Sequence, residues 1–413
     1  MTQELPRLTA AQAAARLGVK PESLYAYVSR GLLSRERDAA GSWFDPLEIE
    51  SFARRRRRAA VGGAVPTGPA GGPGGATAAG TPLMVLDTDL AHIDDDELYY
   101  RDRSVAQLAQ TTSFEAAVEW LWNVPELRTP DRADVDVARR TMAALGDEAS
   151  PLDRLLVAVT AFATTDPLRD DPAPEHLTRI GARLLTGLPS ALADGGSGDA
   201  IAPTLWRALG GSPGTIRAEG VRVLDAALVL VIDHDLAVST LAARVAASAR
   251  GSGYAAVTAA LGAFESPLHG TASRAATRML EDVIGGATPS AALARAIRDG
   301  GRGIPGFGQP LYAGGDMRAR VLLDMLRSAE GTGEVIAAVD GVSAEVERRA
   351  GARPNLDLAL AALTLWARMP EDAGSVVFAV GRIAGWLTHA MNEYEQRPMR
   401  LRPRGRYVGP PAD

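Results

Sequence analysis

Apolar residues recur at helical spacing along most of this chain, and strand-like alternation is rare. From residue 104 onward, apolar positions lie three and four apart in runs that short turns containing Gly, Pro or Ser separate. These runs predict helices over 104–109, 113–122, 132–145, 151–164, 173–185, 203–209, 215–232, 237–247, 254–264, 267–284, 289–299, 317–329, 334–350, 354–369 and 374–395. The predicted fold class is therefore all-α, after a short extended start over 83–101.

Residues 7–58 show a second, smaller pattern. Thr9 is a candidate N-cap for a helix over 10–17, which Gly18 ends, and a second helix follows Pro21 over 24–29. A hairpin is expected over 35–44, and a third helix over 47–58 finishes in five arginines. The pattern predicts a small helical domain at the start of the chain.

This order of helix, glycine turn, helix and hairpin resembles the winged helix-turn-helix of MerR-like and excisionase-like proteins. The resemblance rests on residues 8–19, 24–28 and 31–33, and it implies that the second helix and the wing contact DNA. The candidate DNA-binding residues are Ser23, Tyr25, Tyr27, Arg30 and Arg37. The alternative is a helical domain for protein contact, with the arginine run over 54–58 as an ordinary solvated surface.

Charge and composition divide the chain in the same place. Residues 1–58 carry 11 Lys and Arg against 7 Asp and Glu, whereas the rest carries 33 against 43, for a net charge of −6. A Gly-, Pro- and Ala-rich stretch over 59–81 separates the two parts and is predicted to be a disordered linker. A basic head on an acidic body over 82–411 suggests two different partners.

The remaining composition excludes several classes of protein. There is no cysteine, so disulfides and cysteine-bound metals are excluded, and no metal site is expected. Residues 1–6 do not resemble a signal peptide, and the apolar run over 226–232 is far shorter than the roughly 20 residues that span a bilayer. We expect a cytoplasmic protein with no membrane contact.

Two polar residues stand at predicted helix starts in the body. Ser266 can cap a helix with Pro267 at its first position, which would place His269 in the first turn. The positive end of the helix dipole favours neutral imidazole there, and such a histidine can donate a hydrogen bond to an oxygen that becomes negative. Taken alone, a histidine bonded to a nearby carbonyl is the more common case.

Asp357 follows Pro354 and Asn355 at the start of a strongly apolar helix, where the dipole favours an ionised carboxylate. A carboxylate base and a neutral histidine donor together suit proton abstraction next to a carbonyl. Asp357 is equally compatible with an ordinary N-terminal cap, and spacing alone does not establish that the two residues meet.

Seven segments, in order, are similar to motifs of the citrate synthase family over residues 82–411. They are Asp233-His234-Asp235 with Ser239-Thr240, the helix over 254–263, Pro267-Leu268-His269-Gly270, Gly306-Phe307-Gly308-Gln309-Pro310-Leu311-Tyr312, Asp316-Met317-Arg318-Ala319, Pro354-Asn355-Leu356-Asp357, and residues 381–389 with 402–410. The resemblance implies a citrate synthase-like, two-domain helical body with a small domain over roughly 270–370. It also implies a homodimer.

The resemblance further implies a condensation of acetyl-CoA with oxaloacetate that gives citrate and CoA, with no bound cofactor. By position, Asp357 would abstract the methyl proton and His269 would donate to the thioester oxygen. The oxaloacetate carboxylates would be held by His234, Arg318 and Arg382, and by Arg402 or Arg404 across the dimer interface. For each arginine, the alternative is an ordinary surface ion pair.

Four positions depart from the family pattern. Gln309 replaces a histidine that is implied to protonate or polarise the oxaloacetate carbonyl, and Pro310 replaces an arginine placed for anionic groups. Val231 and Ala237 replace a histidine and an asparagine. Glutamine can donate a hydrogen bond but cannot transfer a proton, and losing a proton donor typically costs about 10²–10⁴-fold in rate. A slow enzyme, a changed acceptor and an inactive protein all remain possible.

The sequence thus predicts an enzyme that condenses acetyl-CoA, or another short acyl-CoA such as propionyl-CoA, with oxaloacetate. In this prediction Gln309 takes the third catalytic position beside His269 and Asp357. The alternative is a DNA-binding transcription regulator whose degenerate body senses acyl-CoA or a dicarboxylate. An inert dimeric scaffold is the third possibility.

Overall fold

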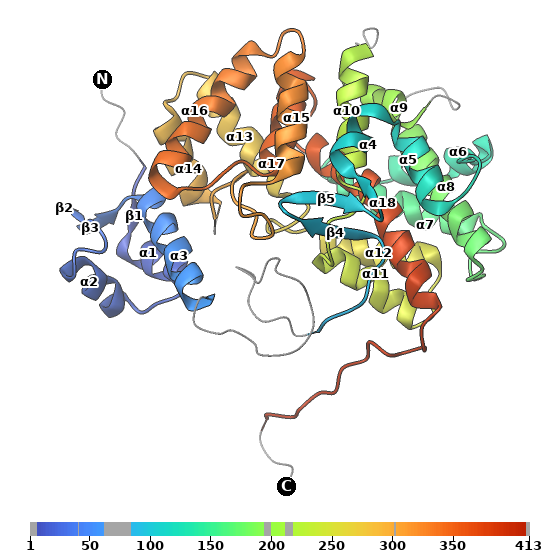
Figure 1. The fold of residues 1–413 in the computed structure, drawn as a ribbon, viewed down its shortest axis with the longest axis horizontal. Coiled ribbons are helices and arrows are strands. Elements are labelled where there is room, and N and C mark those ends of the chain that lie inside the picture. The colour runs from blue at the N-terminus through green and yellow to red at the C-terminus, as the bar shows by residue number, and fades with distance from the viewer. Residues whose placement is uncertain are drawn as a thin grey trace.

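The computed structural model describes residues 6–39, 41–61, 84–193, 200–210, 218–300 and 303–409, and most of this chain is helical (Figure 1). The helices of the body are α4 (Val105–Thr111), α5 (Phe114–Trp122), α6 (Arg132–Ala143), α7 (Pro151–Thr164), α8 (Pro174–Leu192), α9 (Ile201–Leu209), α10 (Ala218–Leu230), α11 (Val238–Ser248), α12 (Gly253–Phe264), α13 (Ala272–Ile284), α14 (Pro289–Asp299), α15 (Met317–Ser328), α16 (Gly333–Ala350), α17 (Leu356–Trp366) and α18 (Ala373–Tyr394). The helical prediction for the body is confirmed.

The longest helix, α18, runs through the middle of the body. It packs against α8, α10, α11 and α12, and 19 of its 22 residues are buried (Figure 1). This is why its sequence is apolar all round rather than on one stripe. Polar side chains within it are therefore enclosed by protein and require partners or a ligand.

The helices α13 to α17 form a neighbouring group that packs mainly within itself. Helix α13 packs against α14, α16 and α17, and α15 packs against α17. Helix α17 also contacts α10 and α18, so it joins this group to the central helix.

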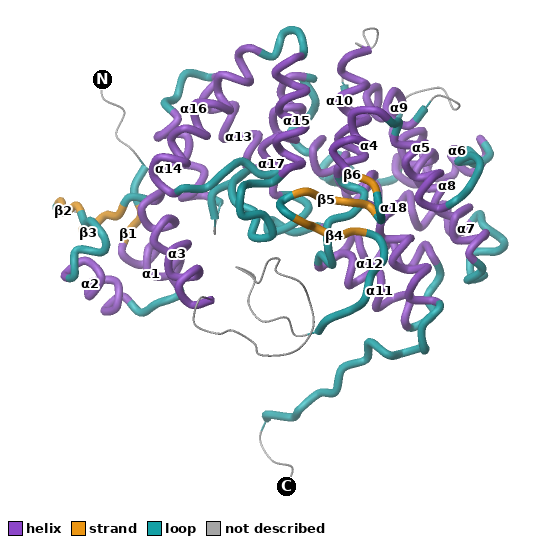
Figure 2. Tube along the Cα trace, in the orientation of Figure 1, coloured by secondary structure: helices purple, strands orange, loops and turns teal. Residues whose placement is uncertain are grey.

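The extended start of the body is a small antiparallel sheet of β4 (Ala91–Asp94), β5 (Glu97–Tyr100) and β6 (Arg103–Ser104) (Figure 2). Strands β4 and β5 form a hairpin that pairs Asp94 with Glu97. Its two turn residues, Asp95 and Asp96, have positive φ angles of 48° and 64°, which suit a two-residue hairpin turn.

The head has its own core and packs on one side of the body. Its elements are β1 (Leu8–Thr9), α1 (Ala10–Leu17), α2 (Pro21–Ser29), β2 (Glu36–Asp38), β3 (Gly41–Phe44) and α3 (Pro46–Val61). Thr9 caps α1 through a capping box, and Gly18 ends the helix in a left-handed conformation at φ 62°, as the sequence predicts. Helix α3 packs against α14 and α16 of the body (Figure 1).

The boundary between the head and the linker differs from the sequence prediction. Helix α3 continues to Val61, so the first residues assigned to the linker are helical. The arginine and alanine residues at its end are good helix formers, which favours this extension. The rest of the predicted linker, residues 62–81, lies outside the described residues.

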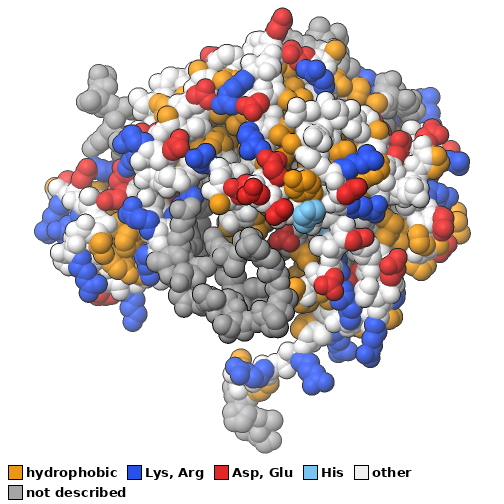
Figure 3. Space-filling model, viewed as in Figure 1, with side chains coloured by type: hydrophobic (Ala, Val, Ile, Leu, Met, Phe, Trp, Pro, Cys, Tyr) orange, Lys and Arg blue, Asp and Glu red, His pale blue; other side chains and the backbone are white. Residues whose placement is uncertain are grey.

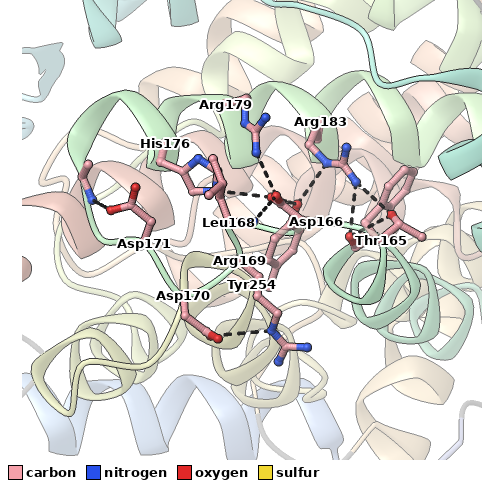
Figure 4. A network of polar contacts seen from close by, with 12 residues as sticks. Thr165, Asp166, Leu168, Arg169, Asp170, Asp171, His176, Arg179, Arg183 and Tyr254 are labelled. Carbon is pink, nitrogen blue, oxygen red and sulfur yellow. Dashed lines mark hydrogen bonds and ion pairs between the residues drawn. The ribbon is translucent and has the colours of Figure 1, made fainter.

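A buried polar cluster lies where the end of α7 meets α8 and α12 (Figure 4). It contains none of the candidate catalytic residues. The Asp166 carboxylate accepts hydrogen bonds from Arg179 at 2.8 Å, from the Tyr254 hydroxyl at 2.9 Å and from the Leu168 N–H at 3.0 Å. Burial acts to raise the pKa of Asp166, but these hydrogen bonds and the charge of Arg179 have the larger combined effect. The net result is a lowered pKa. The cluster therefore stabilises an ionised carboxylate inside the body.

Among the helices of the described segments, none combines the length and the apolar character that crossing a bilayer requires.

Candidate active site

The candidate residues of the body come from five separate elements. His234 follows α10, His269 precedes α13, and Arg318, Asp357 and Arg382 lie on α15, α17 and α18. After burial, the charge of Arg382 acts on the pKa values of His234 and His269, and the charge of Arg318 acts on those of His234 and Asp357, so the five side chains form one electrostatic neighbourhood. The fold thus brings together residues that are up to 148 positions apart in the chain.

Arg382 is the most unusual of these side chains because it is buried and forms no ion pair with any of the described residues, although the charge of Asp233 acts to raise its pKa. Its Nε donates to the carbonyl oxygen of Val231 at 2.5 Å, whereas Nη1 and Nη2 have no hydrogen-bond partner among the described residues. Burial lowers the pKa of Arg382 to about 10, so the side chain still carries its charge at neutral pH. A buried guanidinium with two unpaired nitrogens is costly unless an anion binds it.

Arg318 is also buried, but its own helix cap neutralises it. Asp316, the N-cap of α15, accepts from Nε of Arg318 at 3.0 Å and from Nη2 at 2.8 Å. The same carboxylate accepts from the N–H of Leu356 at 3.1 Å, at the start of α17. Burial opposes the charge of Arg318, but Asp316 raises its pKa above the usual range.

His234 is buried beside a tyrosine of the loop that contains Gln309. Its Nε2 lies 3.0 Å from the hydroxyl of Tyr312, and the two rings are 5.4 Å apart. Burial, followed by the charges of Arg318 and Arg382, lowers the pKa of His234 well below its ordinary value. A neutral imidazole at this place can donate one hydrogen bond to a substrate oxygen without adding charge.

The prediction that His269 lies in the first turn of a helix is wrong. Helix α13 begins at Ala272, and His269 lies in a tight turn in which Gly270 N–H donates to the carbonyl of Phe264 at 2.9 Å. A Cβ on Gly270 would come within 2.3 Å of the Phe264 ring, so only glycine fits this close turn. Ser266 does not cap α13; its hydroxyl accepts from the N–H of Leu268 at 3.2 Å instead.

His269 is nevertheless held neutral, by a different cause from the predicted dipole. Burial and then the charge of Arg382 lower its pKa to about 4. Its Nε2 lies 2.7 Å from the hydroxyl of Ser239, which also accepts from Nε1 of Trp386 at 3.2 Å. Because the indole can only donate, the Ser239 hydrogen can be donated to Nε2, and in this arrangement the imidazole proton is on Nδ1.

Asp357 lies in the first turn of α17, as predicted, and Asn355 caps that turn by accepting from the Asp357 N–H at 3.0 Å. Its ionisation differs from the sequence expectation. Burial raises the pKa of Asp357 to about 7 and outweighs the lowering by Arg318. A carboxylate with a pKa near neutral is well matched to the task of a general base.

Gln309 lies in the loop between α14 and α15 and is partly buried. Its Oε1 accepts from the N–H of Leu311 at 3.4 Å, and its backbone carbonyl accepts from the N–H of Tyr312 at 3.3 Å. The loop is fixed to the start of α17, because Gly308 N–H donates to the Arg353 carbonyl at 2.9 Å. The structure thus places the Gln309 loop next to the Asp357 helix.

The two predicted tail arginines do not join this group within one chain. Arg402 and Arg404 are exposed on an extended segment that leaves the body after α18 and points away from it (Figure 1).

The candidate DNA-binding residues also lie outside the site. Arg30 and Arg37 are exposed on the head, whereas Tyr27 packs its ring 4.9 Å from that of Phe52.

Several residues of the site were missed by sequence reasoning. Ser239 and Trp386 orient His269, Tyr312 contacts His234, and Asp316 holds Arg318. A fifth missed residue is Asp233, whose Oδ2 lies 3.1 Å from Nε2 of His389. Of these, Asp316 had a usable signal, because an acidic residue two positions before an arginine at a helix start can cap the helix and pair with the arginine.

Together these side chains suit one class of protein. A carboxyl with a pKa near neutral, a neutral histidine and a buried arginine in a helical body fit an enzyme that removes a proton from carbon in an anionic-substrate site. Within the described ranges, no group of three or more His, Asp or Glu side chains could hold a metal ion.

The comparisons with known proteins agree with this class. The family described as citrate synthase, C-terminal domain, matches residues 79–404. A citrate synthase of Haloferax volcanii is 28% identical over 79% of this chain and 94% of its own. A 2-methylcitrate synthase of Corynebacterium glutamicum is 27% identical over 76% of this chain and 90% of its own.

Solved structures show the same fold. The citrate synthase of Thermotoga maritima has a TM-score of 0.63 at 23% identity, over 79% of this chain and 94% of that one. The Thermoplasma acidophilum citrate synthase, solved as a ternary complex with carboxymethyl coenzyme A and oxaloacetate, has a TM-score of 0.64 at 23% identity, over 80% and 95%. The chain therefore belongs to the citrate synthase family, and its enzyme class is that of citrate synthase-type acyltransferases.

Proposed function

We propose that this protein condenses acetyl-CoA, or a closely related short acyl-CoA, with oxaloacetate to give citrate or its homologue and free CoA. The acyl-CoA is a substrate, and the condensation needs no resident cofactor. The observation that carries the proposal is Arg382, a buried arginine with two unpaired nitrogens in the same electrostatic neighbourhood as His269. It fits a substrate carboxylate beside a carbonyl-polarising donor.

The dicarboxylate is held by Arg382, Arg318 and His234. Arg382 binds one carboxylate through Nη1 and Nη2, a geometry that a guanidinium matches with two parallel hydrogen bonds. Arg318 adds a second charge whose direction Asp316 fixes. Neutral His234 then donates to a substrate oxygen from the Tyr312 side.

The first chemical step is removal of a proton from the acyl carbon of the thioester. Asp357 takes this proton, and Nδ1 of His269 donates a hydrogen bond to the thioester oxygen as it becomes an enol oxygen. The enol carbon then attacks the ketone carbon of oxaloacetate to form a C–C bond. Water cleaves the resulting thioester, which releases CoA.

Gln309 takes the place of the proton donor to the ketone oxygen. Its amide N–H₂ stabilises the developing alkoxide by a hydrogen bond but supplies no proton, so the alkoxide is protonated from water. This predicts an enzyme slower than one with a histidine there, by about 10²-fold or more.

We propose a homodimer in which the tail completes the site. Val238 and Val245, seven positions apart on α11, leave 68% and 46% of their surface exposed, which suits a helix covered by a partner. The extended tail carries Arg402 and Arg404 away from its own body. In a dimer, either arginine can reach the oxaloacetate of the partner subunit. The small domain of each subunit would span roughly 270–370.

The deciding experiment measures CoA release from acetyl-CoA plus oxaloacetate, with propionyl-CoA in parallel. Turnover that falls at least about 10²-fold in Asp357→Asn supports the proposal. Asp324→Asn, an exposed aspartate on α15, is the matched control and should retain full activity. A folded wild-type protein that binds oxaloacetate but releases no CoA from either thioester contradicts it.

We propose a second activity for the head. Its segment over 7–58 has the element order of a winged helix-turn-helix, and α1 and α3 face inward while α2 and the β2–β3 hairpin expose Arg30 and Arg37. We propose that this face binds DNA. A gel shift that weakens at least about threefold in Arg30→Ala, and falls further with added salt, supports this. Salt-insensitive or absent binding contradicts it.

A further inference from the structure

The head is fixed on the body by two polar contacts at separate places. Arg16 donates through Nη2 to the carbonyls of Ile297 and Arg298, the latter at 3.0 Å, at the C-terminal end of α14. Asp45, just before α3, binds Arg349 of α16 at 2.7 Å. The first is a cation on the carbonyl end of a helix, which is a favourable contact, and the second is an ion pair; together they hold the head in one orientation on the body.

In this orientation Arg54 of α3 reaches the loop that contains Gln309. Its Nη1 lies 4.0 Å from the position that a Cβ would take on Gly308, the residue directly before Gln309. Arg54 is partly buried between the head and this loop. A head residue therefore lies at the edge of the candidate active site.

Its neighbours on α3 point elsewhere, as the 100° step between helical residues requires. Arg55 is exposed and donates to the Ser51 hydroxyl at 3.3 Å. Arg56 turns back to the head, where it donates to the Leu17 carbonyl at 3.4 Å and covers the Tyr27 ring. Of these three arginines, only Arg54 faces the loop.

The segment beside Arg54 leads directly to the general base. Gly308 pairs with the start of α17, because its carbonyl accepts from Nδ2 of Asn355 at 3.2 Å, and Asn355 caps the turn that holds Asp357. Reaction at Asp357 requires the acyl group inside the site and the long remainder of the acyl-CoA outside it. Arg54 lies at that boundary.

The two ends of the loop differ in charge. At the far end, Asp96 accepts from the N–H groups of Ala313 and Gly314, both at 2.6 Å, and acidic side chains gather over the β4–β5 turn (Figure 3). At the near end stands Arg54, whereas the exposed Arg353 directs its side chain to Gly315 at the far end. Residues 303–316, the described part of the loop before α15, contain no Lys or Arg. An anion beside Gly308 therefore meets the charge of Arg54 on the head.

We infer that Arg54 binds a phosphate of the acyl-CoA, so that the head forms part of the acyl-CoA site. This inference rests on the proposed function. Arg54 already has a polar partner in the structure, but a guanidinium with five N–H donors keeps that partner and still binds a phosphate. The role is one of substrate affinity, because Arg54 touches the carrier and not the reacting atoms.

The test compares Arg54→Ala with Arg55→Ala, a neighbour of equal charge that points to solvent. With acetyl-CoA, Arg54→Ala should raise KM about tenfold at unchanged kcat, Arg54→Lys should recover most of it, and Arg55→Ala should change KM less than twofold. With S-acetyl-pantetheine, which has the same thioester and no phosphate, all three variants should equal the wild type. Acetyl-dephospho-CoA separates the 3′-phosphate from the diphosphate as the partner, and either result supports the inference.

Equal effects of Arg54→Ala on acetyl-CoA and on S-acetyl-pantetheine would overturn the inference, because a purely structural role affects both. So would equal KM values for Arg54→Ala and Arg55→Ala. If the wild type shows no turnover, the proposed function fails, and calorimetry with free CoA and pantetheine decides the inference separately. A tenfold loss of CoA affinity confined to Arg54→Ala supports it, and unchanged CoA affinity overturns it.

Discussion

Both carboxylate oxygens of Asp316 accept hydrogen bonds from the guanidinium of Arg318, at 3.0 and 2.8 Å, although the two residues are only two positions apart in the chain. One short segment thus provides a buried positive charge and the group that orients it. The Leu356 N–H bonds the same carboxylate, so the charge of Arg318 and the position of the Asp357 helix depend on one side chain.

Replacing Asp316 by Asn should therefore destabilise the protein and weaken oxaloacetate binding together. Breaking a buried ion pair by removing one partner costs about 3–5 kcal/mol in the free energy of unfolding. Urea denaturation measures this, with Asp324→Asn as the control, since its ion pair with Arg327 is exposed and should cost less than about 0.5 kcal/mol. Equal losses in the two variants would contradict the role of Asp316.

Arg382 gives the opposite prediction for stability. Replacing this buried, unpaired charge by Met should raise the free energy of unfolding of the substrate-free protein by about 1–4 kcal/mol. Oxaloacetate should stabilise the wild type against heat and leave the Arg382→Met variant unchanged. Thermal denaturation with and without oxaloacetate tests both statements, and a variant that is less stable and still responds to the ligand would exclude the proposed site.

The pH profile of the reaction should report Asp357. Since the pKa of this carboxyl is about 7 in the free protein, kcat/KM for the acyl-CoA should rise with pH and level off above about 7. His269 and His234, whose pKa values are lowered, stay neutral through this range. A profile that is flat from pH 5 to 8 would assign the proton abstraction to another group.

Asp357 should also affect stability, with a definite sign. Its folded-state pKa of about 7 lies above the unfolded value of about 3.9, so its contribution is complete below pH 3.9 and is lost as pH rises through 7. Asn cannot ionise, so Asp357→Asn should become more stable relative to the wild type between pH 5 and pH 8. Urea unfolding at the two pH values measures the difference, and a constant difference would refute the raised pKa.

Ser239 should act on the rate through His269. In Ser239→Ala, the imidazole loses the partner that fixes its tautomer, and Trp386 loses its acceptor. A lost hydrogen bond of about 1–3 kcal/mol corresponds to a kcat lower by about 5- to 150-fold, with KM for oxaloacetate nearly unchanged. Ser328→Ala, at an exposed hydroxyl on α15, is the control. A change confined to KM would argue against a role in the chemical step.

The helical body was predictable because its helices are long, strongly apolar and bounded by ordinary caps. Ser113 and Ser150, for example, cap α5 and α7 by accepting from N–H groups three residues on. The start of α13 was not predictable in this way. Ser266 and Pro267 have the composition of a helix start, but the close approach of Gly270 to Phe264 produces a turn there, and this contact forms only in the folded protein.

The candidate residues were found from motifs, and their electrostatics were not. The helix dipole predicts an ionised Asp357, whereas burial raises its pKa to about 7, because desolvation outweighs a partial charge at a helix end. The contact of Arg54 with the Gly308 loop was equally out of reach, since it depends on how two separate cores pack against each other. The tail arginines Arg402 and Arg404 stay predictions, because their role depends on a second chain.

Four side chains along one stripe of α18 bond to the segment between Val231 and Arg244. Arg382, Trp386, His389 and Glu393 do so over eleven positions, or about 16 Å of helix. Sliding α18 by a single turn would break all four contacts at once, so this helix behaves as a fixed rod in the enzyme. Movement that admits substrate is then expected in elements that pack beside this helix, such as α17, and not in α18 itself.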